Sequence, residues 1–244
     1  MSLVFTTTSC DMDLTPDSAV PEHEALRTID DCDAWVVGIY SAFKNSALYS
    51  GYMTLLPDIQ ADMAYAALNT NNGFYTNIYQ WDIKSTTDEI IAVYNGLYTI
   101  VARCNFFLDY KDQVEVNLKT TADKDNFKKR LGEVYFARAM AYAELIRLFC
   151  EPMTSVNADT ENMGICLPTT YRDDVPKVKR STLRESYNQI ISDLKSAEDN
   201  LPDSRTVADS HYFSKGAVYA LRARIYMYMG MGDLKRDRNN EYLK

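Results

Sequence analysis

Residues 69–82 of the 244-residue sequence carry side chains suited to binding a neutral polyhydroxylated molecule such as a sugar. Four asparagines stand there among aromatic residues. Asparagine both donates and accepts hydrogen bonds, and aromatic rings offer flat apolar faces for stacking. The candidate binding residues are Asn71, Asn72, Tyr75, Asn77, Tyr79 and Trp81. The competing interpretation is a loop whose aromatic side chains turn inward to cover the core, with Trp81 docking the loop.

Residues that would support catalysis are scarce. The sequence contains no HExxH, GxSxG, GxGxxG or P-loop pattern, and its two histidines, His23 and His211, have no ligand-like neighbours in sequence. Asp58 and Asp62 would share one face of a helix, and a helical glycoside hydrolase needs such a carboxylate pair. In a chain with 34 acidic residues, a solvated helix face or a cap is the more ordinary explanation. We therefore predict no enzymatic activity, no cofactor and no metal site.

Composition limits the class of protein. Hydrophobic residues make up 46% of the chain, enough for a sizeable core, and the net charge of −8 argues against nucleic acid or an anionic membrane surface as a partner. The five cysteines are scattered without a CxxC pair, a spacing that fits neither a zinc site nor a redox motif. We expect Cys104 and Cys150 to be buried thiols. No apolar run of about 18 residues is present, so no bilayer-spanning helix is predicted.

The N-terminal residues leave two interpretations open. Residues 4–10 lack a charged segment and a full hydrophobic segment, so they do not form an intact signal peptide. They fit the end of such a signal, in which case Cys10 is the acylated residue of a lipoprotein. The alternative is a terminal tail with an accidental cysteine.

Apolar residues at helical spacing predict a mostly helical chain. The expected helices cover residues 22–44, a short stretch from Pro57 to residue 68, and residues 88–109, 132–149, 182–200 and 211–229. The segment 132–149 is rich in Ala, Leu, Arg and Glu, and one face of its helix is expected to be apolar. Ser181 is the expected cap of the helix over 182–200. Residues 111–123 and 150–179 are expected to be connectors, the second long and irregular.

The helix over 132–149 has an echo later in the chain. Residues 132–142 match residues 216–226 at six positions without a gap. The preceding helices echo each other as well, through Tyr94-Asn95 and Tyr187-Asn188. Two similar helical hairpins, each ending in an Ala-rich helix, are typical of stacked tetratricopeptide-type repeats.

These blocks together resemble the SusD/RagB family of outer-membrane glycan-binding lipoproteins. The resemblance is carried by residues 9–16, the pair Tyr94-Asn95, the Arg138-Ala139 block within residues 132–142, and Lys215-Gly216-Ala217. Their order and spacing extend over about residues 10–228. The Arg-Ala-Xaa-Xaa-Tyr and Lys-Gly-Ala blocks are weak separately and fairly specific together.

The resemblance implies an all-α fold of tetratricopeptide-like helical hairpins with irregular loops. It implies a lipoprotein tether over residues 1–21 with Cys10 lipidated, a SusD-like helical domain over 22–232 and a polar tail over 233–244. Family members are usually much longer, so this chain resembles their N-terminal half.

The function implied by the resemblance is non-catalytic. Such a protein captures oligosaccharides or other nutrients at the cell surface and delivers them to a TonB-dependent, SusC-like transporter of the outer membrane. Membrane contact would occur only through the lipid anchor. The alternative function is a tetratricopeptide-like scaffold that binds a protein partner and no sugar.

Overall fold

The computed structural model describes residues 21–66, 73–171 and 179–231. Regular structure in these ranges is helical, apart from one isolated bridge between Cys166 and Arg180. The elements are the 3-10 turn Glu22–Glu24, α1 Ile29–Phe43, α2 Tyr52–Gln60, α3 Thr76–Tyr79, α4 Asp88–Glu115, α5 Thr121–Phe149, α6 Leu183–Asn200 and α7 Lys215–Met231. The predicted all-α class is confirmed. Almost all of the predicted tether, including Cys10, and the whole of the predicted tail lie outside the described residues.

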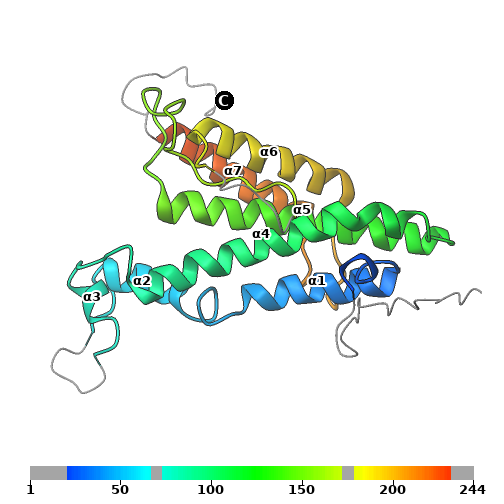
Figure 1. Cartoon of the computed structure of the whole chain (residues 1–244), viewed down its shortest axis with the longest axis horizontal. Helices are drawn as coiled ribbons and strands as arrows, with labels where there is room; N and C mark the ends of the chain where they lie inside the picture. Colours follow the sequence, from blue (N-terminus) through cyan, green and yellow to red (C-terminus); the bar gives the residue numbers. More distant parts are fainter. Residues whose placement is uncertain (1–20, 67–72, 172–178, 232–244) are drawn as a thin grey trace, which may run out of the picture.

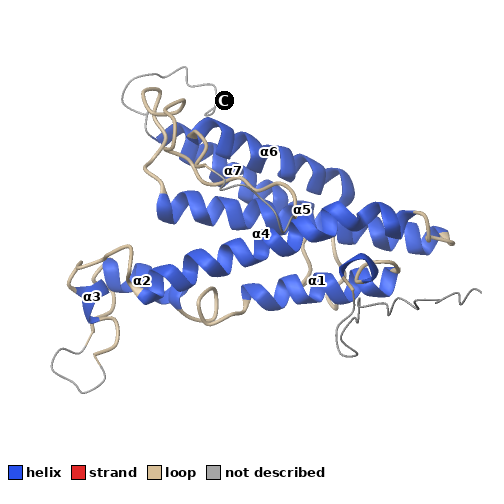
Figure 2. Ribbon diagram, in the orientation of Figure 1, coloured by secondary structure: helices blue, strands red, loops and turns tan. Residues whose placement is uncertain are grey.

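The long helices α4 and α5 form an antiparallel pair along the length of the molecule (Figure 1). Helices α6 and α7 pack on one side of this pair, α1 and α2 lie on the other, and α3 lies at one end (Figure 2). Because α5 contacts α1, α4, α6 and α7, residues 132–146 are buried on nearly every side. The predicted apolar face therefore accounts for only part of the buried surface of this helix.

Three helices begin with a capping box between a threonine and the acidic residue three positions later. The threonine side chain accepts a hydrogen bond from the backbone N–H of the acidic residue, and the acidic side chain accepts one from the backbone N–H of the threonine. The pairs are Thr28–Asp31, Thr120–Asp123 and Thr182–Glu185. The predicted cap Ser181 is therefore one residue too early. The first pair starts α1 at Ile29, later than predicted, and the second extends α5 toward the N-terminus, so that only residues 116–120 separate α4 from α5.

Helix α2 differs most from the prediction. It begins after Gly51, where a side-chain Cβ would lie 2.1 Å from the Ser46 carbonyl oxygen, so this close approach requires glycine. Pro57 lies in the middle of α2 and not in its first turn. The helix ends at Gln60, eight residues earlier than predicted, and Met63 beyond it is 79% exposed.

The α4–α5 and α6–α7 hairpins share side-chain geometry as well as sequence. The Arg138 guanidinium lies over the Tyr135 ring at 5.8 Å, and Arg222 lies over Tyr219 at 5.9 Å. These are matched positions of the predicted repeat, and such cation–π contacts are favourable. Helix α7 begins at Lys215, four residues later than predicted.

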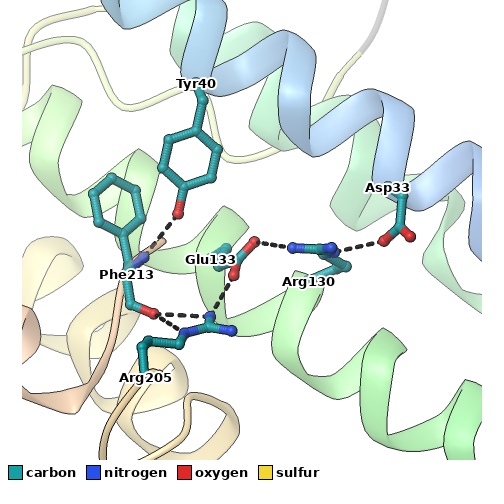
Figure 3. Close-up of polar contacts among 6 residues, drawn as sticks. All are labelled: Asp33, Tyr40, Arg130, Glu133, Arg205 and Phe213. Atoms are coloured by element: carbon teal, nitrogen blue, oxygen red, sulfur yellow. Dashed lines mark hydrogen bonds and ion pairs between the residues drawn. The ribbon is translucent and has the colours of Figure 1, made fainter. Parts of the chain in front are cut away.

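A polar network centred on the buried Glu133 ties α1 and α5 to the segment that precedes α7 (Figure 3). Its members are Asp33, Tyr40, Arg130, Glu133, Arg205 and Phe213. The Glu133 carboxylate is 1% exposed and accepts hydrogen bonds from Arg130 and Arg205. Because a buried carboxylate is costly unless it is paired, Glu133 requires both arginines in place. The network therefore fixes the approach of the second hairpin to α5.

The structure bears on two expectations about apolar segments. Helix α4 is long and apolar enough to cross a membrane by length and composition alone, although no span was predicted. It packs against α1 and α5 and carries much of the core, as the central helix of a folded domain does. Cys104 is buried as predicted, but Cys150 is only half-buried.

Candidate functional site

The end of the molecule that carries α2 and α3 (Figure 1) includes five aromatic residues that are exposed or partly buried. We call Tyr65, Phe74, Tyr75, Tyr79 and Trp81 the aromatic tip. Tyr65, Phe74 and Trp81 are 80%, 67% and 63% exposed, more than any other aromatic side chain among the described residues. Exposed aromatic faces gathered at one place mark an interaction site more often than they serve folding.

A small separate core holds the aromatic tip in place. Leu56 and Ile59 of α2 are buried against Ile78 of α3, apart from the main core. Tyr75 and Tyr79 pack partly against this cluster, and the Tyr75 ring meets the Tyr52 ring edge-on at 6.0 Å. The inward-facing interpretation of the loop thus holds in part for Tyr75 and Tyr79.

The outward position of Trp81 follows from how α3 ends. Trp81 has a φ of 58°, its N–H donates to the Ile78 carbonyl at 3.1 Å, and the Asp82 N–H donates to the Asn77 carbonyl at 2.8 Å. These two bonds form a Schellman cap, whose left-handed residue is usually glycine. A side chain there costs on the order of 1 kcal/mol. A tryptophan held exposed at that cost points to a role outside folding.

Two further residues of this region share the left-handed conformation. Asp62, beyond the end of α2, has a φ of 58°, with its own N–H bonded to the Ile59 carbonyl and the Met63 N–H bonded to the Asp58 carbonyl. Tyr75 precedes α3 with the same φ. Three of the four non-glycine residues with positive φ in the described ranges therefore lie in this region. Such residues cluster at functional sites.

A cavity of about 320 Å³ lies beside the aromatic tip, between α2, residues 83–85, the start of α4 and the end of α5. Its walls are largely apolar and include Tyr52, Leu56 and Phe149, while Gln60 and Lys84 add polar groups. Small-molecule sites usually start at about 300 Å³ and combine apolar walls with a few polar groups. Tyr52 lines the cavity and contacts the aromatic tip, so the two features form one continuous region.

The structure brings together four of the predicted binding residues. Tyr75, Asn77, Tyr79 and Trp81 lie within or beside α3, and the Asn77 side chain is exposed. A tyrosine hydroxyl is a hydrogen-bond donor at neutral pH, and burial raises the pKa of the Tyr75 phenol further above its ordinary value. Asn71 and Asn72 lie outside the described residues. Contact of any of these residues with a ligand stays a prediction.

The sequence interpretation missed two aromatic residues of this region. Tyr65 falls in the predicted helix up to residue 68, which in fact ends at Gln60, and Phe74 lies in the predicted binding loop outside the six candidate residues. The end of α2 was not visible in the sequence, because the left-handed position after the helix, which is usually a glycine, is taken by Asp62. For Phe74, its place directly after the Asn71-Asn72-Gly73 turn was the available signal.

The weak carboxylate-pair hypothesis is not supported. Asp58 is exposed in the last turn of α2, and Asp62 lies beyond the helix end, so the two do not share a helix face. His211 is exposed and its ring lies beside that of Tyr212. Within the described ranges, no group of three His, Cys, Asp or Glu side chains is placed to hold a metal ion.

A SusD-like family model, described as "Starch-binding associating with outer membrane", matches residues 12–227. The chain belongs to the SusD-like family. SusD-like protein P2 of Formosa agariphila is 22% identical over 230 residues, which are 93% of this chain and 42% of that relative. SusD-like protein P38 of the same organism is 24% identical over 91% of this chain and 39% of its own length. The resemblance stated from the sequence is confirmed, and this SusD-like chain spans less than half the length of the curated relatives it matches.

Solved structures share the fold of this SusD-like chain. A SusD homologue from Bacteroides thetaiotaomicron superposes with a TM-score of 0.69 at 24% identity, covering 84% of this chain and 37% of the other. A laminarin-binding SusD-like protein gives a TM-score of 0.65 at 19% identity, covering 84% and 41%. At these identities the likeness establishes the fold, and the binding function of this SusD-like chain must be argued from its own residues.

Proposed function

We propose that this chain binds oligosaccharides at the aromatic tip without transforming them. The observation that carries the proposal is Trp81, which is 63% exposed at a left-handed helix cap where glycine would be less costly. An exposed indole can stack on the apolar face of a sugar ring, while Asn77 beside it offers donors and acceptors to hydroxyl groups. The starch-binding description of the family and the name of the laminarin-binding relative support this ligand class.

The finer parts of the proposal come from the family resemblance. Cys10 would carry the lipid that tethers the protein to the outer membrane at the cell surface. The bound oligosaccharide would be delivered to a TonB-dependent, SusC-like transporter. Asn71 and Asn72 would complete the binding loop beside Tyr75 and Tyr79.

Calorimetric titration with laminarin and starch oligosaccharides tests the binding step. We expect Trp81→Ala and Tyr79→Ala to weaken binding at least about tenfold, or about 1.4 kcal/mol. The matched control is Val116→Ala, which removes an 83% exposed apolar side chain at the far end of α4. Equal affinity of Trp81→Ala, Tyr79→Ala and the parent protein would remove the tip from the site. Release of reducing sugar during the titration would contradict binding without catalysis.

A further inference from the structure

The cavity beside the aromatic tip suits a different chemical group from the tip itself. Among the described residues that line it, Tyr52, Gln60, Lys84 and Ser85 carry polar side chains and the others are apolar. Leu56 in the wall is buried, whereas Lys84 and Ser85 are exposed, so the apolar part of the cavity is the deeper one. A sugar ring placed there would lose the hydrogen bonds of its hydroxyl groups to water without replacing them. The deeper part of the cavity therefore favours an apolar group over a sugar ring.

The charges around the cavity favour a neutral group. Lys84 is the one charged residue among the described lining residues, and its ammonium group is paired with the Asp82 carboxylate at 3.1 Å. An acidic group of a ligand would have to compete with Asp82 for that partner. Gln60 and Ser85 add polar groups without charge.

Three residues of the wall favour an aromatic ring over an alkyl chain. Tyr52 and Phe149 are themselves aromatic, and Met53 carries a polarizable thioether. Contacts of a ring with other rings and with sulfur are favourable beyond the area that they bury. A cavity of about 150 Å³ with Leu, Ile and Phe walls holds benzene. At about 320 Å³, the present cavity has room for a ring with substituents.

The cavity and the aromatic tip are close enough for one ligand to occupy both. Ile83, which lines the cavity, follows two residues after Trp81, so their Cα atoms are less than about 8 Å apart. Ile83 and Tyr75 also pack partly against the same small core of α2 and α3. A group attached directly to a sugar at the tip is therefore within reach of the cavity.

We propose that the chain prefers oligosaccharides that carry a neutral aromatic group, linked to the sugar as an ester or a glycoside. The inference rests on the oligosaccharide binding proposed above and names the class of oligosaccharide. The sugar stacks on the Trp81 indole, and the aromatic group enters the cavity beside Tyr52, Met53 and Phe149. The neutral polar side chains of the lining provide hydrogen bonds to the oxygen atoms that link the group to the sugar.

Calorimetric titration of the intact chain with the methyl and 4-nitrophenyl glycosides of laminaritriose and maltotriose tests this preference. The 4-nitrophenyl group is neutral while it is linked to the sugar, and the methyl glycoside has the same sugar without the ring. We expect the 4-nitrophenyl glycoside to bind at least about tenfold more tightly than the methyl glycoside of the same sugar.

A variant at the cavity shows where the aromatic group binds. Ser85→Trp places an indole at an exposed position of the lining, so that it competes with the 4-nitrophenyl ring for the cavity. The preference should fall to less than about twofold, while the methyl glycoside binds as it does to the parent. The matched control is Ser192→Trp, at an exposed position of α6 away from the cavity lining, which should keep the full preference. Circular dichroism verifies that both variants keep their helical content.

Two outcomes would overturn this inference while the proposed function stands. One is equal affinity of the parent for the methyl and 4-nitrophenyl glycosides. The other is a preference that survives in Ser85→Trp, since the ring would then stack on the exposed side chains of the aromatic tip without entering the cavity. Absence of binding by all of these glycosides would overturn the proposed function and this inference together.

Discussion

The Asp193 carboxylate on α6 accepts two parallel hydrogen bonds from the Arg138 guanidinium on α5, at 2.8 Å to Nε and 2.7 Å to Nη2. Both side chains are buried. Asn105 Oδ1 accepts a further hydrogen bond from Arg138 Nη1 at 2.8 Å, and Gln189 donates one to Asp193 Oδ1 at 3.0 Å. A buried pair of this kind is a weak source of net stability, but removing one partner leaves an uncompensated charge. The pair therefore fixes how the two hairpins meet.

Asp193→Asn should lower the free energy of unfolding by about 3 kcal/mol, because the Arg138 charge remains buried without its counter-ion. Glu198→Gln removes the charge partner of Arg222 in an ion pair that is more exposed than the Arg138–Asp193 pair, so it should lower the free energy of unfolding much less. Urea unfolding followed by circular dichroism measures both. Similar losses in the two variants would show that burial of the first pair carries no special cost.

The matched glycines Gly132 and Gly216 should respond oppositely to alanine. In Gly132→Ala the new Cβ would lie 2.8 Å from Leu201 and 3.0 Å from Asn200, so overpacking should cost about 1–3 kcal/mol in spite of the better helix propensity. In Gly216→Ala the nearest atom is the Ser214 hydroxyl oxygen at 3.6 Å, so we expect a gain of up to about 1 kcal/mol. Thermal unfolding compares the two variants. A loss of stability in both would contradict the expectation and would show that position 216 requires glycine.

The long helices and the repeat were predictable because both depend on local sequence. Apolar residues at helical spacing mark α4, α5 and α6, and the match of residues 132–142 with 216–226 is visible without a structure. The contacts between elements were not predictable. Nothing local shows that Arg138 meets Asp193, which is 55 residues away, or that α5 is enclosed on nearly every side.

The candidate site was only partly predictable for a similar reason. The asparagine and aromatic content of residues 69–82 indicated a binding loop. The orientation of Trp81, however, depends on a left-handed helix cap, and such a cap is usually recognised in a sequence by its glycine. Asp62 and Trp81 take such positions without that signal. Pro57 gave the wrong helix start, because proline is most common in the first turn and here lies in the middle of α2.

Alkaline pH should destabilise the protein through its buried thiols. Burial raises the pKa of Cys32 from 9.0 to about 12, with Asp33 and Asp31 adding to the shift and Arg130 opposing it. The folded state thus resists ionisation of this thiol more than the unfolded state does. Its contribution is fully present below about pH 9 and is lost as pH rises toward 12, by up to about 1.4 kcal/mol per pH unit.

Urea unfolding between pH 8 and 11 tests this loss. Cys32→Ala should be less stable than the parent at pH 8, because it loses packing, yet its stability should fall less steeply with pH. Parallel pH profiles for the parent and the variant would assign the alkaline loss to other groups, of which the buried Cys104 and Tyr142 also have raised pKa values.

Trp81 allows stability and binding to be separated, because its backbone conformation favours glycine. Trp81→Gly should leave the free energy of unfolding unchanged or raise it by up to about 1 kcal/mol, since glycine adopts a φ of 58° without steric cost. Trp81→Val should lower it, because a β-branched residue is the least suited to that conformation. If the indole is held outward to meet a ligand, both variants lose oligosaccharide affinity while their stabilities diverge. Calorimetry and urea unfolding on the same two proteins decide the matter. A glycine variant that is clearly less stable than the parent would mean that Trp81 serves the fold after all.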